Sequence, residues 1–257
     1  MNIEEIALQL RSAYDDKETI APISEHIGTT DLDTAYKIQN INTEYRARKG
    51  ARIIGKKIGL TSVAIQTQLG VDQPDYGVLF DDMELLIGTT VRVDSMIQPK
   101  AEAEIAFVLS EDLDYENMTI IDLISCIDYA LPSIEIVGSR IANWNIKLTD
   151  TIADNASASR FVLGHRPRTL DEFDVVNCKM QLSKNDEIVS EGFGYNCMGS
   201  PLNATLWLAK KMLQLGQPLQ AGELILSGAL GPMINFGAGD QLKATIDGLG
   251  SVSIFFD

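Results

Sequence analysis

The sequence contains few of the side chains that build disulfide frameworks or soft-metal sites. Its three cysteines are scattered and include no CxxC pair, and its two histidines, His26 and His165, stand in polar, turn-like surroundings. A disulfide scaffold, a zinc knuckle and a histidine-rich metal site are therefore excluded. Cysteine usage of this kind is typical of a reducing compartment.

Basic clusters and long apolar runs are also lacking. Lysine and arginine number 21 against 36 aspartates and glutamates, which gives a formal net charge of −15. Without a basic patch, we expect binding neither to nucleic acid nor to an anionic membrane surface. No apolar run reaches the roughly 18 residues of a membrane span, and the acidic N-terminus has no signal-peptide pattern. These features predict a soluble, cytoplasmic protein.

Apolar side chains make up 45% of the 257 residues, enough for a sizeable core in one or two domains. Their spacing predicts helices at residues 3–13, 30–49, 119–128 and 201–215, the second capped by Thr30. Most of the remainder alternates like antiparallel strands and includes a hairpin at 175–193. We therefore predict an α+β fold with a mainly β core and peripheral helices.

The stretch PKAEAEIAFVL, residues 99–109, is the centre of the functional argument. It favours a strand, on which Glu102 and Glu104 share one face at a spacing of roughly 6.5–7 Å. Two carboxylates on an apolar strand are costly unless a cation lies between them, and hard cations such as Mg²⁺ or Mn²⁺ prefer carboxylate oxygens. The alternative is an amphipathic strand with both glutamates in water.

A second apolar strand, ALPSIEIVGSR at 130–140, carries one further isolated carboxylate, Glu135. Its neighbours Ile134 and Ile136 point to the opposite face of the strand. Three such carboxylates suit a hard-metal site that keeps open positions for a substrate. The polar, irregular stretch that follows, 141–159, is typical of a lid or binding loop and leads to a strand at 160–163.

The stretch ARIIGKKIGLTS, residues 51–62, predicts a strand and then a turn that opens a short helix ending near Gly70. Backbone N–H groups at such a turn, together with the Thr61 and Ser62 hydroxyls, form a carboxylate-binding site. Lys56 and Lys57 point to opposite faces, so one of them can face the interior; the alternative is two surface lysines.

Five stretches, GKKIGLTS, QPDYGVLFDDM, QPKAEAEIAFVL, DTIADNASASRFVLG and AGELILSGAL, occur in this order. Together they resemble the fumarylacetoacetate hydrolase superfamily, and within it the 2-keto-4-pentenoate hydratases of aromatic meta-cleavage pathways. The resemblance runs from about residue 51 to the C-terminus, with a weaker likeness at Ala35 and Tyr36. It implies a mixed β-roll or sandwich at 51–257 that carries the metal and the chemistry, preceded by a helical segment at 1–50.

The resemblance also implies roles for particular residues. Mg²⁺ or Mn²⁺ would be held by Glu102, Glu104 and Glu135, the trio that the spacing had isolated. Lys57 and Asp81 would lie near the substrate and transfer protons, in an order that the resemblance leaves open. The substrate site would be lined by Gly59, Leu60, Thr61, Ser62, Asn155, Ser227 and Gly228.

The implied reaction adds water to a 2-hydroxy-2,4-dienoate and gives a 4-hydroxy-2-oxo acid. Two departures from the family pattern put the substrate in question more than the metal. Gly138 stands where related hydratases usually carry an aspartate, and Tyr195, Asn196 and Cys197 stand where they usually have small residues.

Other activities stay open at this point. A 2-oxo-3-hexenedioate (4-oxalocrotonate) decarboxylase uses the same metal trio. A hydrolase of acylpyruvates is a third possibility, but it needs a base such as a His–Glu pair to activate water, and His26 and His165 are poorly placed in the sequence for that role. A non-catalytic, metal-binding assembly subunit is the alternative outside enzymes. The resemblance further implies a homo-oligomer and an association with a partner decarboxylase.

Overall fold

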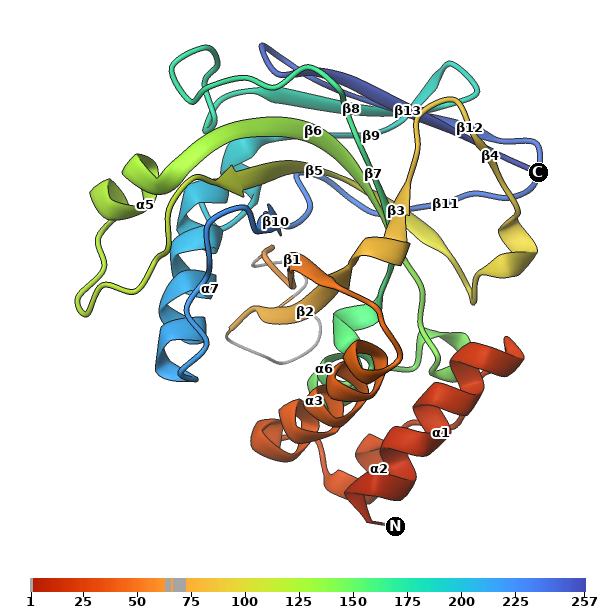
Figure 1. The fold of residues 1–257 in the computed structure, drawn as a ribbon. Coiled ribbons are helices and arrows are strands. Elements are labelled where there is room, and N and C mark those ends of the chain that lie inside the picture. Colours follow the sequence, from red (N-terminus) through yellow and green to blue (C-terminus); the bar gives the residue numbers. More distant parts are fainter. Residues whose placement is uncertain (1, 63–65, 67–72) are drawn as a thin grey trace.

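The computed structural model describes residues 2–62, 66 and 73–257, and a curved mixed sheet forms its centre (Figure 1). Strands β1 and β10 run parallel, as do β3 and β7, and the other neighbours run antiparallel. The strand order is β2 (Asp75–Phe80), β1 (Ile53–Gly59), β10 (Leu224–Leu226), β5 (Lys100–Leu109), β6 (Ile127–Val137), β7 (Ala158–Leu163) and β3 (Glu84–Leu85), with β11 (Ile234–Asn235) also paired to β5.

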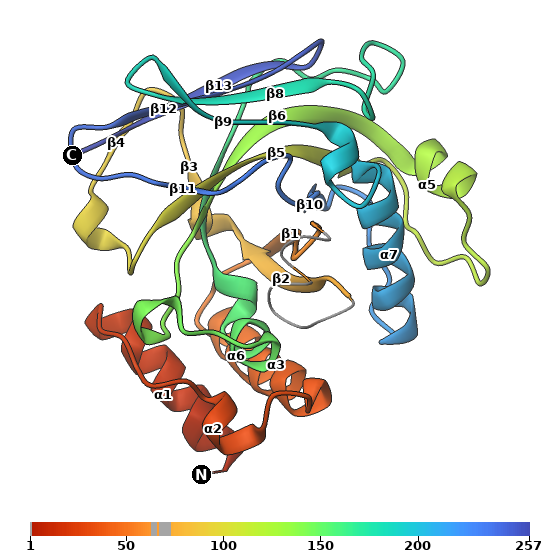
Figure 2. The ribbon, with the colours of Figure 1, turned by 180° about the vertical axis from the view of Figure 1, so that it is seen from behind.

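A second sheet lies over one face of the first, next to β6 (Figures 1 and 2). Its strand order is β4 (Thr90–Val91), β13 (Gly250–Phe256), β12 (Gln241–Ile246), β8 (Lys179–Lys184) and β9 (Glu187–Phe193). Alternation along β5 sends Ala103, Ile105 and Phe107 into the apolar core that includes β8, β12 and β13. The same alternation directs Glu102 and Glu104 to the other face of the main sheet.

The helices stand at the periphery of the sheets. Helices α1 (Ile3–Asp16), α2 (Ser24–Ile27), α3 (Leu32–Arg48) and α6 (Leu148–Ala153) gather at one end of the molecule, whereas α7 (Pro201–Gln214) and α5 (Ile120–Cys126) lie beside the sheets (Figure 2). Ile6, Ile38 and Ile152 meet in a separate apolar cluster that joins α1 and α3 to α6. The helical N-terminal segment therefore packs on a helix that leads directly into strand β7.

The prediction of an α+β fold with a mainly β core is confirmed. Thr119 and Asp122 form a capping box at the start of α5, and Ser200 caps α7. The cap of α3 is Asp31 and not Thr30, because the Asp31 carboxylate accepts the N–H of Thr34. The division at residue 50 stays a prediction.

The strands that the sequence predicts at 175–182 and at 223–229 are both shorter in the structure. Strand β8 begins only at Lys179, because the Asp174 carboxylate turns the preceding backbone by accepting the N–H groups of Val176 and Asn177. Strand β10 ends before Gly228, whose φ of 100° breaks the extended backbone. The short helix expected to end near Gly70 lies outside the described residues. Within the described ranges, no helix has the length and apolar character needed to cross a bilayer.

Candidate active site

Three carboxylates converge where β5 and β6 pair. The register places Glu102 directly opposite Glu135 and Glu104 opposite Ser133. Each glutamate offers one carboxylate oxygen, and these oxygens all lie within 4.8 Å of one another. The structure thus brings together the three residues that the sequence singled out as metal ligands.

Burial makes this cluster electrostatically demanding. Glu104 and Glu135 are 0% and 1% exposed. Burial raises the pKa of Glu102 to about 7, against the opposing effect of Lys57. Burial, reinforced by Glu135, likewise raises the pKa of Glu104 well above its usual range. Anionic groups this close together are unfavourable in a dry site unless a cation accompanies them.

The unpaired oxygens of the cluster fit a hard divalent cation. Glu104 Oε2 accepts the Gly228 N–H at 3.0 Å, whereas Glu104 Oε1 and Glu135 Oε1 find no hydrogen-bond partner among the residues that the structure describes. Buried polar atoms rarely lack a partner, so each such atom needs an explanation. Three carboxylates that offer free oxygens match the ligand preference of Mg²⁺, Mn²⁺ or Ca²⁺.

Lys57 is the cation built into this site. It lies in the middle of β1, is 2% exposed, and places its Nζ 3.2 Å from Glu135 Oε2. The same Nζ donates to the Ala156 carbonyl at 3.2 Å. Although burial favours the neutral amine, the surrounding carboxylates, led by Glu135 and Asp75, outweigh it and raise the pKa of Lys57. Lys57 is therefore held as an ammonium in this structure.

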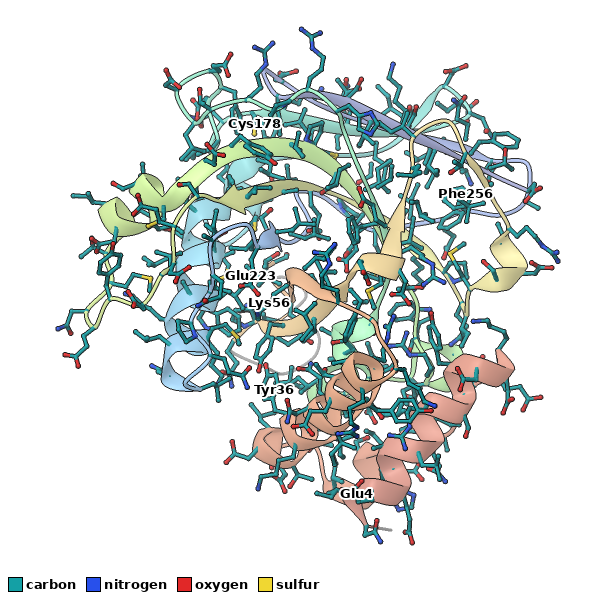
Figure 3. The ribbon with its side chains drawn as sticks, viewed as in Figure 1. Glu4, Tyr36, Lys56, Cys178, Glu223 and Phe256 are labelled. Carbon is teal, nitrogen blue, oxygen red and sulfur yellow. The ribbon has the colours of Figure 1, made fainter. Side chains whose placement is uncertain are left out.

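Its neighbour Lys56 points to the opposite face, as strand alternation predicts. It is nevertheless buried as well, and its Nζ pairs with Glu223 Oε1 at 2.6 Å (Figure 3). The alternative of two surface lysines is therefore wrong, because both lysines are buried.

Asp75 is the residue that the sequence argument missed. It begins β2, is 1% exposed, and its Oδ2 accepts from the Thr151 hydroxyl at 3.2 Å. A Cβ on Gly59 would lie 2.2 Å from Asp75 Oδ1 and 3.4 Å from Lys57 Nζ, so only glycine leaves room for both groups. Burial raises the pKa of Asp75, partly opposed by Lys57. An aspartate at the first position of an apolar strand was the available signal.

The structure places Asp81 elsewhere. It follows the far end of β2, roughly 20 Å along the strand from Asp75 at about 3.3 Å per residue. Its carboxylate accepts the backbone N–H of Arg52 at 3.0 Å and lies 3.7 Å from the Arg52 guanidinium. Asp81 therefore does not meet Lys57, because the six-residue strand separates them.

A cavity of about 380 Å³ opens beside the acidic cluster. Trp144 and Ile146 from the irregular stretch line it, in agreement with the predicted binding loop. The other lining residues are Lys57, Ile58, Gly59, Leu60, Thr61, Ser62, Asp75, Glu102, Val137, Thr151, Ala156, Ser157, Asn196, Ala229, Gly231, Pro232 and Met233. Four of the predicted substrate-site residues, 59–62, are thus among them.

The other predicted substrate residues lie around the cavity and not in its wall. Ser227 and Gly228 precede the lining residue Ala229, and the Gly228 N–H contacts Glu104. Asn155 faces away, because its side-chain amide bonds to both backbone groups of Val78.

The departures from the family pattern also have places in the structure. Gly138 is tightly enclosed, since a Cβ there would lie 2.8 Å from the Ile97 carbonyl oxygen. Asn196 lines the cavity, whereas Cys197 is buried with its Sγ 3.1 Å from the Ser227 carbonyl oxygen. Tyr195 is 46% exposed and stacks on Phe193. Of these, Asn196 alone adds a side chain to the lining.

A curved mixed sheet thus carries three converging carboxylates that could hold a hard cation, beside a buried lysine and an adjoining cavity. Residues 59–254 match the fumarylacetoacetate (FAA) hydrolase C-terminal family, and the chain belongs to this family.

Relatives with known names cover almost the whole chain. The chain is 52% identical over 256 residues to 2-keto-4-pentenoate hydratase 1 of Dechloromonas aromatica (strain RCB), which covers 100% of this chain and 97% of the relative. It is 50% identical to 2-keto-4-pentenoate hydratase of Paraburkholderia xenovorans (strain LB400), over 99% and 94% of the two chains. The solved 4-oxalocrotonate decarboxylase from Pseudomonas putida G7, complexed with magnesium and adipate, superposes with a TM-score of 0.95 at 32% identity, covering 99% and 97%.

Proposed function

We propose that this protein is a hydro-lyase that adds water to a 2-hydroxy-2,4-dienoate with one carboxylate and gives a 4-hydroxy-2-oxo acid. One observation carries the proposal: the cluster of three carboxylates reaches a largely apolar cavity through Glu102, and the buried Lys57 ammonium and the buried Asp75 line the same cavity. The named hydratase relatives at 50–52% identity support the same reaction class.

Glu102, Glu104 and Glu135 are the residues that would hold Mg²⁺ or Mn²⁺. When bound, such an ion supplies Lewis-acid stabilisation of negative charge on the oxygens of a 2-oxo acid. The relative solved with magnesium supports the choice of a hard cation. Gly59–Ser62 would orient the substrate carboxylate with backbone N–H groups and hydroxyls at one side of the cavity.

We assign proton transfer to Lys57 and Asp75 in place of Asp81. In a first half-reaction, the Asp75 carboxylate takes the proton of the dienol oxygen, and the Lys57 ammonium delivers a proton to C5. The substrate is then a 2-oxo-3-enoate, with its double bond between C3 and C4. In the second half-reaction, neutral Lys57 takes a proton from water as its oxygen bonds to C4, and Asp75 returns its proton to C3. Both side chains end in their starting protonation states, so the cycle closes.

The apolar part of the cavity wall indicates an uncharged substrate tail. Val137, Ile146 and Met233 line it, and Lys57 is the one cation among the described lining residues. Lys100 contacts the Trp144 ring, 4.6 Å from its centroid, but is not part of the lining. Residues 63–65 and 67–72, outside the described ranges, contain no lysine, arginine or histidine. A second carboxylate, as in 2-oxo-3-hexenedioate, would therefore have no buried counter-charge.

Product analysis tests the reaction directly. With Mg²⁺ and 2-hydroxypenta-2,4-dienoate in H₂¹⁸O, we expect a 4-hydroxy-2-oxo acid labelled at C4 and no release of CO₂, as followed by NMR and mass spectrometry. Release of CO₂ from 2-oxo-3-hexenedioate, without hydration of the dienoate, would instead make the protein a decarboxylase. Glu104→Gln serves as the control for metal-dependent turnover.

A further inference from the structure

A second cavity, of about 350 Å³, shares no lining residue with the active-site cavity. Helices α1 and α3 form one side of it, and the last two residues of η1 (Asp81–Met83) and the end of α6 form the other. Its lining residues are Leu10, Arg11, Tyr14, Asp15, Gln39, Asn42, Thr43, Tyr45, Arg46, Lys49, Phe80, Asp82, Met83, Arg140, Ala153, Asp154, Asn155 and Ala158. None of the proposed metal ligands, proton-transfer residues or carboxylate-binding residues is in this set.

Helical spacing explains why polar and charged side chains of α1 and α3 meet in this cavity. Gln39, Asn42, Arg46 and Lys49 follow one another at three- or four-residue intervals on one face of α3 and just past its end. Arg11 and Tyr14 do the same on α1. Packing of α1 against α3 brings the two polar faces to one cavity.

Two cations converge on one aromatic ring in this cavity. The guanidinium carbon of Arg11 lies 4.5 Å from the centroid of the Tyr45 ring, and Lys49 Nζ lies 5.7 Å from the same centroid. Arg11 donates to the neutral amide oxygen of Asn42 at 2.6 Å. Among the residues that the structure describes, neither Arg11 nor Lys49 has a carboxylate within 4.0 Å. Like charges that face one cavity without counter-charge favour an anion between them.

The carboxylates of the cavity do not supply that anion. Asp154 is bound to Arg140 and is buried at 3% exposure. Asp82 pairs with Arg46 at 2.5 Å and is itself exposed. Asp15 is exposed and lies outside ion-pair distance of Arg11.

The apolar lining of the cavity indicates what the uncharged part of a ligand would be. Leu10, Phe80 and Met83 give it an apolar part, and the Arg46 guanidinium carbon lies 4.1 Å from the centroid of the Phe80 ring. This guanidinium is already paired with Asp82, so Arg46 adds flat surface to the cavity wall and not a contact for the ligand carboxylate. The volume falls in the range of small-molecule sites, roughly 300–1,000 Å³, and exceeds what a bare inorganic anion fills.

We propose that this cavity is a second binding site, which takes a small organic carboxylate with a flat apolar body. Its carboxylate lies between Arg11 and Lys49, and its apolar body lies against Leu10, Phe80 and Met83. The site is independent of the metal, since it contains neither a proposed metal ligand nor Lys57.

The test is a fluorescence titration of the full-length protein with 2-naphthoate in the presence of EDTA, which removes metal as a carboxylate ligand. We expect saturable binding with a Kd of roughly 1 mM or tighter. Arg11→Ala and Lys49→Ala should each raise that Kd by roughly 10-fold, the scale of a lost charge-assisted contact. Neutral 2-naphthamide should bind more weakly than 2-naphthoate.

Two matched controls separate this cavity from the rest of the protein. Arg48→Ala removes an exposed arginine of α3 that pairs with Glu44 outside the cavity, and Lys57→Met removes the active-site cation; neither should change the Kd. Thr43→Trp, which fills the cavity without altering charge, should abolish binding, so the test does not depend on the charge variants alone. Absence of saturable binding, or binding that Lys57→Met removes and Arg11→Ala leaves intact, overturns the proposal.

Discussion

The side chain of Asn155 bonds to both backbone groups of Val78: its Oδ1 accepts the Val78 N–H at 2.7 Å, and its Nδ2 donates to the Val78 carbonyl at 2.9 Å. Asn155, Ala156 and Ser157 have φ values of 55°, 49° and 56°, a left-handed run that non-glycine residues rarely adopt. The clamp on β2 fixes this turn, and the turn presents the Ala156 carbonyl to Lys57.

The clamp predicts a positioning role for Asn155 in place of substrate contact. Asn155→Ala loses both bonds, so the left-handed turn relaxes and Lys57 loses a fixed acceptor. We expect kcat to fall by roughly 10-fold or more, the scale of a misplaced catalytic group, with KM little changed. Asn143→Ala is the matched control, because Asn143 is also left-handed, with φ 57°, but does not touch β2 or Lys57. Equal kinetic effects in both variants would contradict the role.

The acidic cluster predicts that metal binding needs all three glutamates. Glu102→Gln, Glu104→Gln and Glu135→Gln should each weaken Mg²⁺ binding in isothermal titration calorimetry and sharply lower turnover, with the fold largely kept. Glu223→Gln is the control, since this half-buried glutamate pairs with Lys56 away from the cluster. If Glu135→Gln bound metal as tightly as the parent protein, the ligand assignment would be wrong.

The positions of Lys57, Asp75 and Asp81 predict three different kinetic outcomes. Lys57→Met and Asp75→Asn should lower kcat by roughly 10²–10⁴, the usual scale for loss of a positioned acid or base. Asp81→Asn should leave kcat near the parent value, because this exposed carboxylate only contacts Arg52. Steady-state kinetics at saturating Mg²⁺ measures all three; a loss in Asp81→Asn matching that in Asp75→Asn would restore Asp81 as the partner of Lys57.

The raised pKa values of the glutamates predict how metal-free stability varies with pH. The folded pKa of Glu102 is about 7, above its usual value near 4.5, so the folded chain binds a proton more tightly than the unfolded chain between these values. Unfolding free energy of the metal-free protein should therefore fall as pH rises through this window. Added Mg²⁺ should raise Tm more at pH 8 than at pH 5.5. Thermal melts at both pH values check this, and an equal Mg²⁺ shift at both would contradict it.

Oligomerisation remains a prediction from the family resemblance. Multi-angle light scattering at micromolar concentration should give a mass that is a multiple of the 28.2 kDa chain. A single species at the monomer mass would rule the assembly out. The same measurement with a partner decarboxylase present would show a joint complex as an added, heavier species.

Local periodicity allowed the sequence to determine the main helices and strands and the three glutamates of the acidic cluster. Alternation along a strand is a short-range property, so it placed Glu102 and Glu104 on one face and isolated Glu135 before any pairing was known. The cap of α5 is also a short-range feature, because Thr119 and Asp122, which form it, are three residues apart.

Tertiary structure decided which polar residues share a cavity. Asp75 begins strand β2 and Asp81 follows its other end. Only the pairing of β2 with β1 shows that Asp75 lies opposite Gly59 and close to Lys57, whereas Asp81 lies beside Arg52. In the same way, Arg11 and Lys49 lie on separate helices, and only the packing of α1 on α3 brings both to the Tyr45 ring. Proximity between residues distant in sequence depends on strand register and helix packing, which single-residue patterns do not encode.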